Sequence, residues 1–545
     1  MSATAPTASS PAAPGALKPS GLIGWIESRP RAAFAAFLAL HFAIWTALPT
    51  LLYANLPLDL IEALTYGREW QLGYDKLPPL PWWLVEIMYR VFGVDAAYYA
   101  LAQIVVIAAF VAVFATARPL VGAVGALVAV LIIDGMHYFQ YTAVKFNHDV
   151  IQLPFWAFAG YAFRTALKHG RIGHWLLLGF CFGAALWAKY FVVVLAAPYA
   201  LFLFLDRDAR GALKTPRPWL ALATALIVAS PHIVWLIQTD FLPFAYVEAR
   251  SAPAHGWFDH VKHPAVFMAG QLFFLLPSLF IAAMYLSPLP LVGRGWGWGS
   301  GGDTKSSTGN ARPLDPPPSP PPQGGRDSAA DSFDRRIVAL LAFGPAAAML
   351  ALIAVSGRGA VTMWGYPLWL FVGLWIVLFA PRALDAARLK RVVAAWGAVF
   401  AALALVFLVN YTVLPLIDHR YRAAFFPGDK LGAILTQRFH DATGMPLRYV
   451  IGAMWDGGNV SRYSPDRPEV LVDGLPRRAP WIDLNTLRAA GALVVWTVGP
   501  TDRMPAQLAA IAPTAEVGTP FTLPARRGKP GEVHVGWAIL KPQPN

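Results

Sequence analysis

A series of long apolar runs constrains this chain more than any other feature. A helix needs about 17 to 25 apolar residues to cross a hydrocarbon core about 30 Å thick. Charged residues make up 14% of the chain and the mean hydropathy is +0.48, whereas about a quarter of the residues of soluble proteins are charged. The runs predict about eleven transmembrane helices, at 31–53, 97–117, 120–134, 150–168, 174–189, 190–205, 218–238, 265–286, 337–356, 361–380 and 393–412.

The distribution of Lys and Arg predicts the orientation, because basic loops resist translocation. With the N-terminus in the cytoplasm, 21 of the 44 basic residues fall in inner segments and 8 in short outer loops. An odd number of spans then places the C-terminal region outside the cytoplasm. The net charge of +13 is spread along the chain without an aromatic-interleaved basic patch. We therefore expect the lipid bilayer, and no nucleic acid, as a partner.

Three shifts in composition divide the chain. Residues 1–30 lack an apolar period and are expected to be a disordered cytoplasmic N-terminus. A transmembrane domain over 31–412 follows. Residues 287–336 interrupt it with a segment rich in Gly, Pro and Ser, which cannot form a packed core. This segment is either a cytoplasmic linker or an insertion, since it also resembles the translation product of an intergenic palindromic repeat.

From 413 to 545 the pattern changes to short strand-like runs: RYVIGAMW, EVLVDG, GALVVWTVG and EVHVGWAIL. Helical patterns lie between them at 429–442 and 483–490. We expect a polytopic all-α membrane protein with a small extracytoplasmic (periplasmic) α/β domain at its C-terminus. Asp456-Gly457-Gly458 follows a strand-like run, where α/β folds often bind ligands, but an ordinary turn is the favoured interpretation.

Chemistry is expected in the outer loops, because the central parts of the predicted spans contain no charged residue. This argues against a transporter driven by ions or protons. Asp134 and Lys189, at the ends of spans, are interpreted as residues of the membrane interface. The outer loop 239–264 is interpreted as a flexible flap over an acceptor site.

The first outer loop carries the densest group of carboxylates. If residues 58–70 are helical, one face carries four polar side chains, those of Asp59, Glu62, Tyr66 and Glu69. The other face is apolar and is expected to lie in lipid, with Leu60, Ile61 and Leu64. The Pro78-Pro79 pair that follows predicts an extended segment, which leaves Lys76 beside the membrane surface.

The block LPLDLIEALTYGREWQLGYDKLPPLPWWL resembles the first extracytoplasmic loop of the GT-C glycosyltransferases. The relevant branch holds protein O-mannosyltransferases, lipid A aminoarabinose transferases and rhizobial galacturonosyltransferases. Members typically carry an Asp or an Asp-Glu pair, then Gly-Tyr and a Lys-His-Pro-Pro-Leu-like segment, and Leu77 stands where His is common. Weaker matches are HYFQYTAVKFNHDVIQLPFW, which includes Asp149, and RGAVTMWGYPLWLF at 358–371.

The resemblance implies an activity. One sugar would move from a polyprenyl-phosphate-linked donor to an envelope acceptor, with inversion at the anomeric carbon. The acceptor would be lipid A or lipopolysaccharide, a glycolipid or a protein hydroxyl, on the periplasmic face of the bacterial inner membrane. Two other functions stay open: a transporter or flippase of a lipid-linked sugar, and a non-catalytic assembly scaffold.

The resemblance also implies roles for seven residues. Asp59 would be the general base and Asp149 a second catalytic carboxylate that orients the acceptor. Lys76, then Arg358 and Lys145, would stabilise the departing phosphate, and Glu62 and Tyr74 would also contact substrate. No cofactor is assigned, and a divalent cation held by Asp149 with Asp59 or Glu62 stays open.

Overall fold

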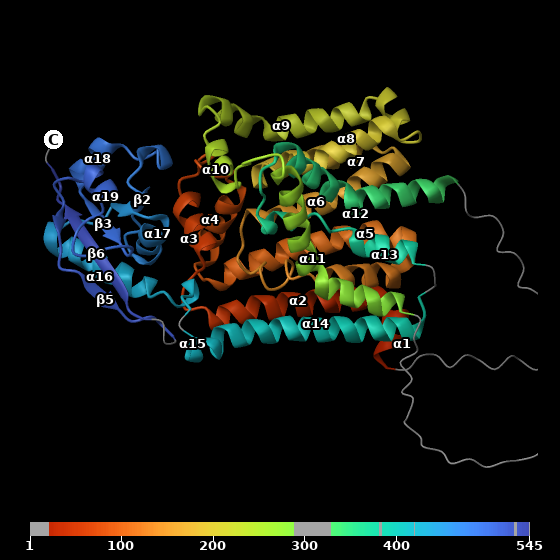
Figure 1. Cartoon of the computed structure of the whole chain (residues 1–545), viewed down its shortest axis with the longest axis horizontal. Coiled ribbons are helices and arrows are strands. Elements are labelled where there is room, and N and C mark those ends of the chain that lie inside the picture. The colour runs from red at the N-terminus through yellow and green to blue at the C-terminus, as the bar shows by residue number, and fades with distance from the viewer. Residues whose placement is uncertain (1–20, 288–328, 381–383, 419, 528–530, 544–545) are drawn as a thin grey trace, which may run out of the picture.

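The computed structural model describes residues 21–287, 329–380, 384–418, 420–527 and 531–543. A long helical body is capped at one end by a smaller α/β unit (Figure 1). Most of the expected disordered segment 1–30 and most of the 287–336 insertion lie outside the described residues. The described ends of both segments are helical. Helix α1 (Leu22–Ser28) is ordered because Ile26 packs into the core, and α12 begins at Ala329.

Six helices among the described residues are long and apolar enough to cross a membrane by themselves. They are α2 (Pro30–Leu52), α5 (Ala96–Asp134), α9 (Arg217–Gln238), α11 (Asp259–Leu286), α12 (Ala329–Ser356) and α14 (Ala386–Thr412). Apolar helices α7 (Ile172–Ala188) and α8 (Val192–Leu205) are shorter. The remaining elements of the body are α3 (Leu58–Gly67), α4 (Leu80–Phe92), α6 (His148–His169), α10 (Pro243–Arg250), α13 (Val372–Phe379), α15 (Leu414–Ile417), and the 3₁₀ turns η1 (Arg210–Lys214), η2 (Thr362–Gly365) and η3 (Ala423–Phe425).

The spans expected at 97–117 and 120–134 correspond to two helices that are joined in α5 across a kink at Gly122, where the backbone φ is 72°. One expected span differs from the observed helices. The span expected at 361–380 begins as the turn η2 and becomes α-helical only at Val372. Length and composition therefore identify fewer independent spans than the eleven expected.

A buried polar cluster lies where α5 ends. Asp134 has no exposed surface, and its carboxylate accepts hydrogen bonds from Trp396 Nε1 at 2.7 Å and Gln140 Nε2 at 3.0 Å. His41 Nδ1 lies 3.0 Å from the other carboxylate oxygen. The expectation that Asp134 lies at the membrane interface is therefore wrong. The cluster fixes the start of the non-helical segment 135–147, most of whose residues are buried in the protein.

The C-terminal unit contains one six-stranded sheet. Its strands are β1 (Tyr449–Gly452), β2 (Glu469–Val472), β3 (Ala492–Trp496), β4 (Glu516–Val517), β5 (Phe521–Leu523) and β6 (Val533–Leu540). The order is β2-β1-β3-β6-β4, and β5 also pairs with β6. Strands β1, β2 and β3 are parallel, whereas β6 is antiparallel to its neighbours. The helices are α16 (Gly428–Thr443), α17 (Met454–Tyr463), η4 (Pro476–Arg478), α18 (Leu484–Ala490) and α19 (Ala506–Ile511).

All four strand-like runs of the sequence form strands, and both expected helices form as α16 and α18. One expectation for this region is wrong. The run RYVIGAMW stops being a strand at Gly452, and Asp456-Gly457-Gly458 lies inside helix α17 instead of in a turn.

Helix α17 packs against α3 and thereby joins the two parts of the protein. A Cβ atom on Gly458 would lie 2.6 Å from Ile61 Cγ2 and 2.8 Å from Thr65 Oγ1, so only glycine allows this close approach. The apolar face of α3 is buried in protein and does not lie in lipid as expected: Leu60 and Ile61 have no exposed surface and Leu64 is 3% exposed. The α/β unit thus covers the helix that carries the acidic residues.

Candidate active site

Helix α3 presents the acidic residues of the first loop. Asp59 lies in its first turn, where the helix dipole favours a negative charge, and Glu62 follows one turn later. The helix ends at Gly67, where only glycine fits, because a Cβ atom there would lie 2.3 Å from the Trp82 carbonyl oxygen. Glu69 therefore falls beyond the helix, outside the cavity lining, and pairs with Arg68.

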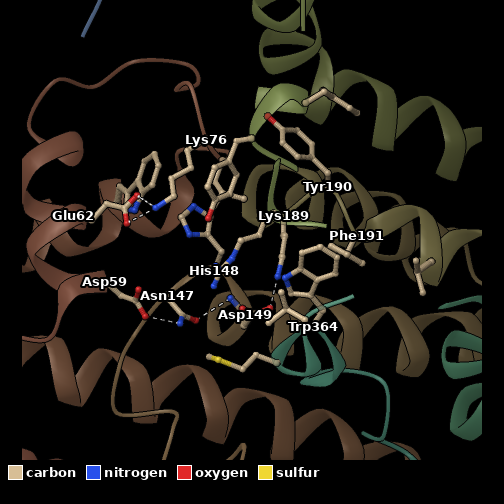
Figure 2. A pocket seen from close by; sticks show the side chains of 18 of the residues that line it. Asp59, Glu62, Lys76, Asn147, His148, Asp149, Lys189, Tyr190, Phe191 and Trp364 are labelled. Carbon is tan, nitrogen blue, oxygen red and sulfur yellow. Dashed lines mark hydrogen bonds and ion pairs between the residues drawn. The ribbon is translucent and has the colours of Figure 1, made fainter. Parts of the chain in front are cut away.

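Asp59 and Glu62 line a cavity of about 490 Å³, to which six other segments of the body also contribute side chains. Figure 2 shows Asp59 and Glu62 on one side and Lys189, Phe191 and Trp364 on the other. The charged and polar lining residues are Asp59, Glu62, Lys76, Lys145, Asn147, His148, Asp149, Lys189, Tyr190, Tyr246 and Arg250. The apolar part of the lining includes Phe191, Val193, Val194, Phe244, Leu352 and Trp364.

Each carboxylate in the cavity has its own partner within the protein (Figure 2). Asn147 Nδ2 donates a hydrogen bond of 2.9 Å to Asp59 Oδ2, and its carbonyl oxygen caps helix α6 by accepting from the Asp149 amide at 3.0 Å. Lys76 Nζ lies 2.8 and 2.9 Å from the two oxygens of Glu62. The Lys189 ammonium contacts the Asp149 carboxylate.

His148 holds the loop that carries Lys76 in place. His148 is 5% exposed, and its Nε2 donates to the Pro78 carbonyl oxygen at 2.9 Å. Burial opposes the charge on Lys76, but the Glu62 carboxylate outweighs it, so the pKa of Lys76 is raised. Burial also raises the pKa of Glu62, and Lys76 offsets part of that effect. The Lys76 ammonium is thus a charged group fixed at the cavity wall.

Lys145 differs from the other lysines of the cavity, because it forms no ion pair among the residues that the structure describes. Four basic side chains line the cavity, those of Lys76, Lys145, Lys189 and Arg250, against the three carboxylates of Asp59, Glu62 and Asp149. The surplus positive charge suits an anionic ligand.

A second cavity, of about 320 Å³, meets the first at two residues, because Asp59 and Lys145 line both. Its other polar lining residues are Tyr53, Tyr411, Tyr421 and Arg422. The guanidinium of Arg422 is held by both oxygens of Asp418, at 2.7 and 2.9 Å. The Asp59 carboxylate therefore lies between two spaces of different character, one partly apolar and one rich in tyrosine.

Of the seven site residues expected from the sequence, the structure brings five to the cavity: Asp59, Glu62, Lys76, Lys145 and Asp149. Tyr74 does not line it. Its ring is buried against Tyr66 and Trp82, and its hydroxyl donates to the Tyr66 carbonyl oxygen at 2.7 Å. Arg358 does not line it either, because its guanidinium turns away to Glu248, whose carbonyl oxygen it contacts at 2.8 Å.

Sequence reasoning missed Lys189, Asn147 and Arg250. Lys189 was expected at the membrane interface, but it is 5% exposed and faces the cavity. A lysine between two apolar runs was the signal, since such a residue is commonly functional when it faces the protein interior. Arg250 arrives on α10, so the outer loop expected to be a flap does contribute cavity wall, with Phe244 and Tyr246.

The carboxylates do not form a metal site. No group of three or more His, Cys, Asp or Glu side chains within the described ranges is placed to hold an ion. Glu62 and Asp149, which the sequence left open as ligands, are each paired with a lysine. The donor set therefore does not fit the divalent cation left open by the sequence.

Asp456 serves the α/β unit and not a ligand. It is 3% exposed and accepts hydrogen bonds from the Thr497 amide at 3.1 Å and the Thr497 hydroxyl at 2.7 Å. Burial raises the pKa of its carboxyl to about 6, although the Thr497 hydrogen bonds lower it.

This raised pKa predicts a pH dependence of stability. A carboxyl that binds its proton more tightly when folded stabilises the protein most below pH 4, and that contribution is lost as the pH rises through 6. The loss amounts to about 3 kcal/mol for a shift of about two pKa units. Asp456→Asn should remove this dependence. Thermal unfolding of both proteins between pH 4 and 7.5 checks it, and parallel pH profiles would contradict it.

Comparisons with known proteins agree with this architecture. The model of the dolichyl-phosphate-mannose-protein mannosyltransferase family matches residues 76–235. Lipid A galacturonosyltransferase RgtD of Rhizobium johnstonii is 27% identical over 230 residues, 40% of this chain and 46% of that protein. Lipopolysaccharide core galacturonosyltransferase RgtB of the same organism is 25% identical over 214 residues, 38% and 43% of the two chains. The chain thus spans less than half the length of these curated relatives.

Similarity of the fold to solved structures covers almost the whole chain. The structure of ArnT from Cupriavidus metallidurans bound to undecaprenyl phosphate superposes with a TM-score of 0.59 at 12% identity, covering 95% of this chain and 98% of ArnT. Its apo structure gives a TM-score of 0.58. The resemblance to the GT-C superfamily of membrane glycosyltransferases is thereby confirmed. The chain has an ArnT-like fold, with a multi-pass helical body and a small C-terminal sheet.

Proposed function

We propose that the protein transfers a single sugar from a polyprenyl-phosphate-linked donor to a hydroxyl of an envelope acceptor. The acceptor is lipid A or lipopolysaccharide, a glycolipid or a protein. The observation that carries this proposal is that the Asp59 carboxylate and the Lys145 ammonium line both cavities. A base and an unpaired cation at the meeting point of two spaces are the groups that a displacement between two substrates requires.

The donor fits the larger cavity. Val193, Val194 and Leu352 give its wall an apolar part that suits a prenyl chain, while Lys76, Lys145 and Lys189 supply positive charge for the phosphate. The names of the relatives support this class of ligand, since the ArnT structure holds undecaprenyl phosphate and the curated relatives act on lipid A and lipopolysaccharide core. The acceptor then enters through the smaller cavity.

Asp59 acts as the general base. The acceptor oxygen attacks the anomeric carbon, the bond from that carbon to the phosphate oxygen breaks, and the hydroxyl proton passes to the Asp59 carboxylate. A single displacement of this kind inverts the anomeric carbon. Asn147 orients the carboxylate by its hydrogen bond to Oδ2, which leaves Oδ1 for the acceptor.

The leaving group is polyprenyl phosphate, whose negative charge grows as the bond breaks. Lys76 and Lys145 are already charged and in place, so they stabilise this charge without reorganisation. Asp149 is not free to bind a cation, because Lys189 holds it. We assign Asp149, with Lys189, to orienting the substrate at the far wall of the cavity.

The arrangement of domains is proposed on the same grounds. Residues 31–412 form the glycosyltransferase body, and residues 413–545 form a periplasmic unit that covers α3. The body lies in the bacterial inner membrane with a cytoplasmic N-terminus, as the distribution of Lys and Arg predicts.

Lys145→Met tests the proposal without disturbing the fold, because Lys145 has no carboxylate partner among the described residues to be left unpaired. Hydrogen bonds to charged groups contribute about 1.5–3 kcal/mol, so kcat/KM for transfer should fall about ten- to a hundredfold. The assay uses proteoliposomes with a radiolabelled polyprenyl-phosphate sugar and lipid A. Lys262→Met, which removes an exposed lysine outside the cavity, is the control and should transfer normally.

The same assay separates the enzyme from a flippase of a lipid-linked sugar. A transferase moves label onto the acceptor and releases polyprenyl phosphate. A flippase moves the intact donor across the bilayer and leaves the acceptor unlabelled. Label that crosses the membrane while still attached to the prenyl lipid, with no labelled acceptor for any of the three acceptor classes, would refute the proposal.

A further inference from the structure

Arg478 of the α/β unit makes a charged contact with the loop that carries Lys76. Arg478 lies on the 3₁₀ turn η4, just after strand β2 ends beside the helical body (Figure 1). Its Nε lies 2.8 Å from Asp75 Oδ2. Asp75 immediately precedes Lys76, so a residue from the far end of the chain directly holds the neighbour of a cavity cation.

Asp75 and Arg478 each have a further hydrogen-bonding partner. The second oxygen of Asp75 accepts a hydrogen bond of 2.9 Å from the Tyr66 hydroxyl on α3, and Arg478 Nη2 lies 3.4 Å from the same hydroxyl. The Arg478 guanidinium also contacts Asp473. Both oxygens of Asp75 are thus occupied, and its side chain is only 12% exposed.

The local backbone is shaped to bring Arg478 to this place. Asp473 has a φ of 55° and Gly474 a φ of 66°, so the chain turns sharply at the end of β2 through a conformation that most residues avoid. Trp481, a few residues later, packs its ring against Tyr66 and Tyr74 at centroid distances of 6.0 and 5.6 Å. Polar and aromatic contacts from one short segment therefore converge on the loop.

Two ion pairs hold consecutive residues of this loop against two different parts of the protein. Lys76 is paired with Glu62 on α3, and Asp75 with Arg478 on the α/β unit. Without the second pair, Asp75 keeps only the Tyr66 hydroxyl, which belongs to the same helix α3 that already holds Lys76 through Glu62.

We propose that Arg478 is a positioning residue: through Asp75 it fixes Lys76 at the cavity wall, and the α/β unit thereby controls how the donor phosphate is bound. The role of Lys76 in this inference rests on the proposed function. The structural coupling between Arg478 and the loop does not.

Arg478→Gln tests the inference, with Arg462→Gln as its matched control. Arg462 also joins the α/β unit to the helical body, through Asp95 at 2.8 Å, but it does not touch the Lys76 loop. Loss of a charged hydrogen bond should raise amide hydrogen exchange in residues 71–79 about tenfold in the full-length protein. Arg462→Gln should leave exchange in that segment unchanged.

The KM values for the two substrates give a second test. They distinguish loss of the Arg478 contact from a general loosening of the α/β unit on the helical body. Arg478→Gln should raise the KM for the polyprenyl-phosphate sugar about tenfold and leave the KM for the acceptor unchanged. Because Arg478 acts through Asp75, the double variant Arg478→Gln/Asp75→Asn should be no worse than the single one.

Unchanged exchange at 71–79 in Arg478→Gln, or an equal increase in Arg462→Gln, would overturn the inference. A rise in both substrates' KM values together would also overturn it, because that indicates a general loss of structure. A selective rise in exchange in a protein that transfers no sugar from any donor would support the positioning contact and refute the proposed function.

Discussion

Asp59→Asn is expected to lower the rate of sugar transfer by about 10²- to 10⁴-fold, the range typical for loss of a general base. The asparagine side chain has nearly the same shape, and it can still accept the hydrogen bond that Asn147 donates at 2.9 Å. It cannot take up the proton of the acceptor hydroxyl. The measurement is the initial rate in proteoliposomes, together with expression level and thermal midpoint, which should match those of the wild-type protein.

Glu69→Gln is the matched control for that variant. Glu69 is a carboxylate of the same loop, but it lies outside the cavity and pairs with Arg68. Its amide variant should transfer sugar at close to the wild-type rate. Undiminished transfer by Asp59→Asn, or an equal loss in Glu69→Gln, would remove Asp59 from the reaction.

Lys189→Met is expected to destabilise the protein by about 3–5 kcal/mol, because it leaves the Asp149 carboxylate buried without its cation. The side chains of Lys189 and Asp149 are 6% and 13% exposed, so water can replace little of the lost interaction. Transfer should fall as well, since both residues line the cavity. Thermal unfolding in detergent and the transfer assay measure the two effects separately.

The double variant Lys189→Met/Asp149→Asn distinguishes stability from function. With the charge of Asp149 also removed, most of the lost stability should return. Transfer should not return, because neither side chain is then available to orient the substrate. A single variant as stable as the wild-type protein would contradict the importance of this ion pair.

Patterns within a short stretch of sequence were sufficient for much of the fold and part of the site. The three- and four-residue spacing placed Asp59, Glu62 and Tyr66 on one helix face, because helix geometry depends only on local spacing. The prediction was wrong for Glu69, because the helix ends at Gly67. Alternating and apolar runs likewise located strands β1, β2, β3 and β6. Lys76 was found through the family motif that surrounds it.

The remaining features depend on contacts between residues far apart in the chain. Lys189 meets Asp149 across 40 positions, and Arg478 meets Asp75 across 403. No local sequence pattern predicts either contact. The apolar face of α3 was assigned to lipid because an amphipathic helix beside a membrane usually lies on it, but here the α/β unit competes for that face and covers it through Gly458.

We propose that the donor phosphate binds beside Asp59, at the place where the larger and the smaller cavity meet. Cryo-electron microscopy of the protein with bound undecaprenyl phosphate tests this most directly. We expect density for the phosphate within hydrogen-bond distance of Lys76 or Lys145, with the prenyl chain running along Val193 and Leu352. A phosphate bound elsewhere, with Asp59 facing an empty cavity, would contradict it.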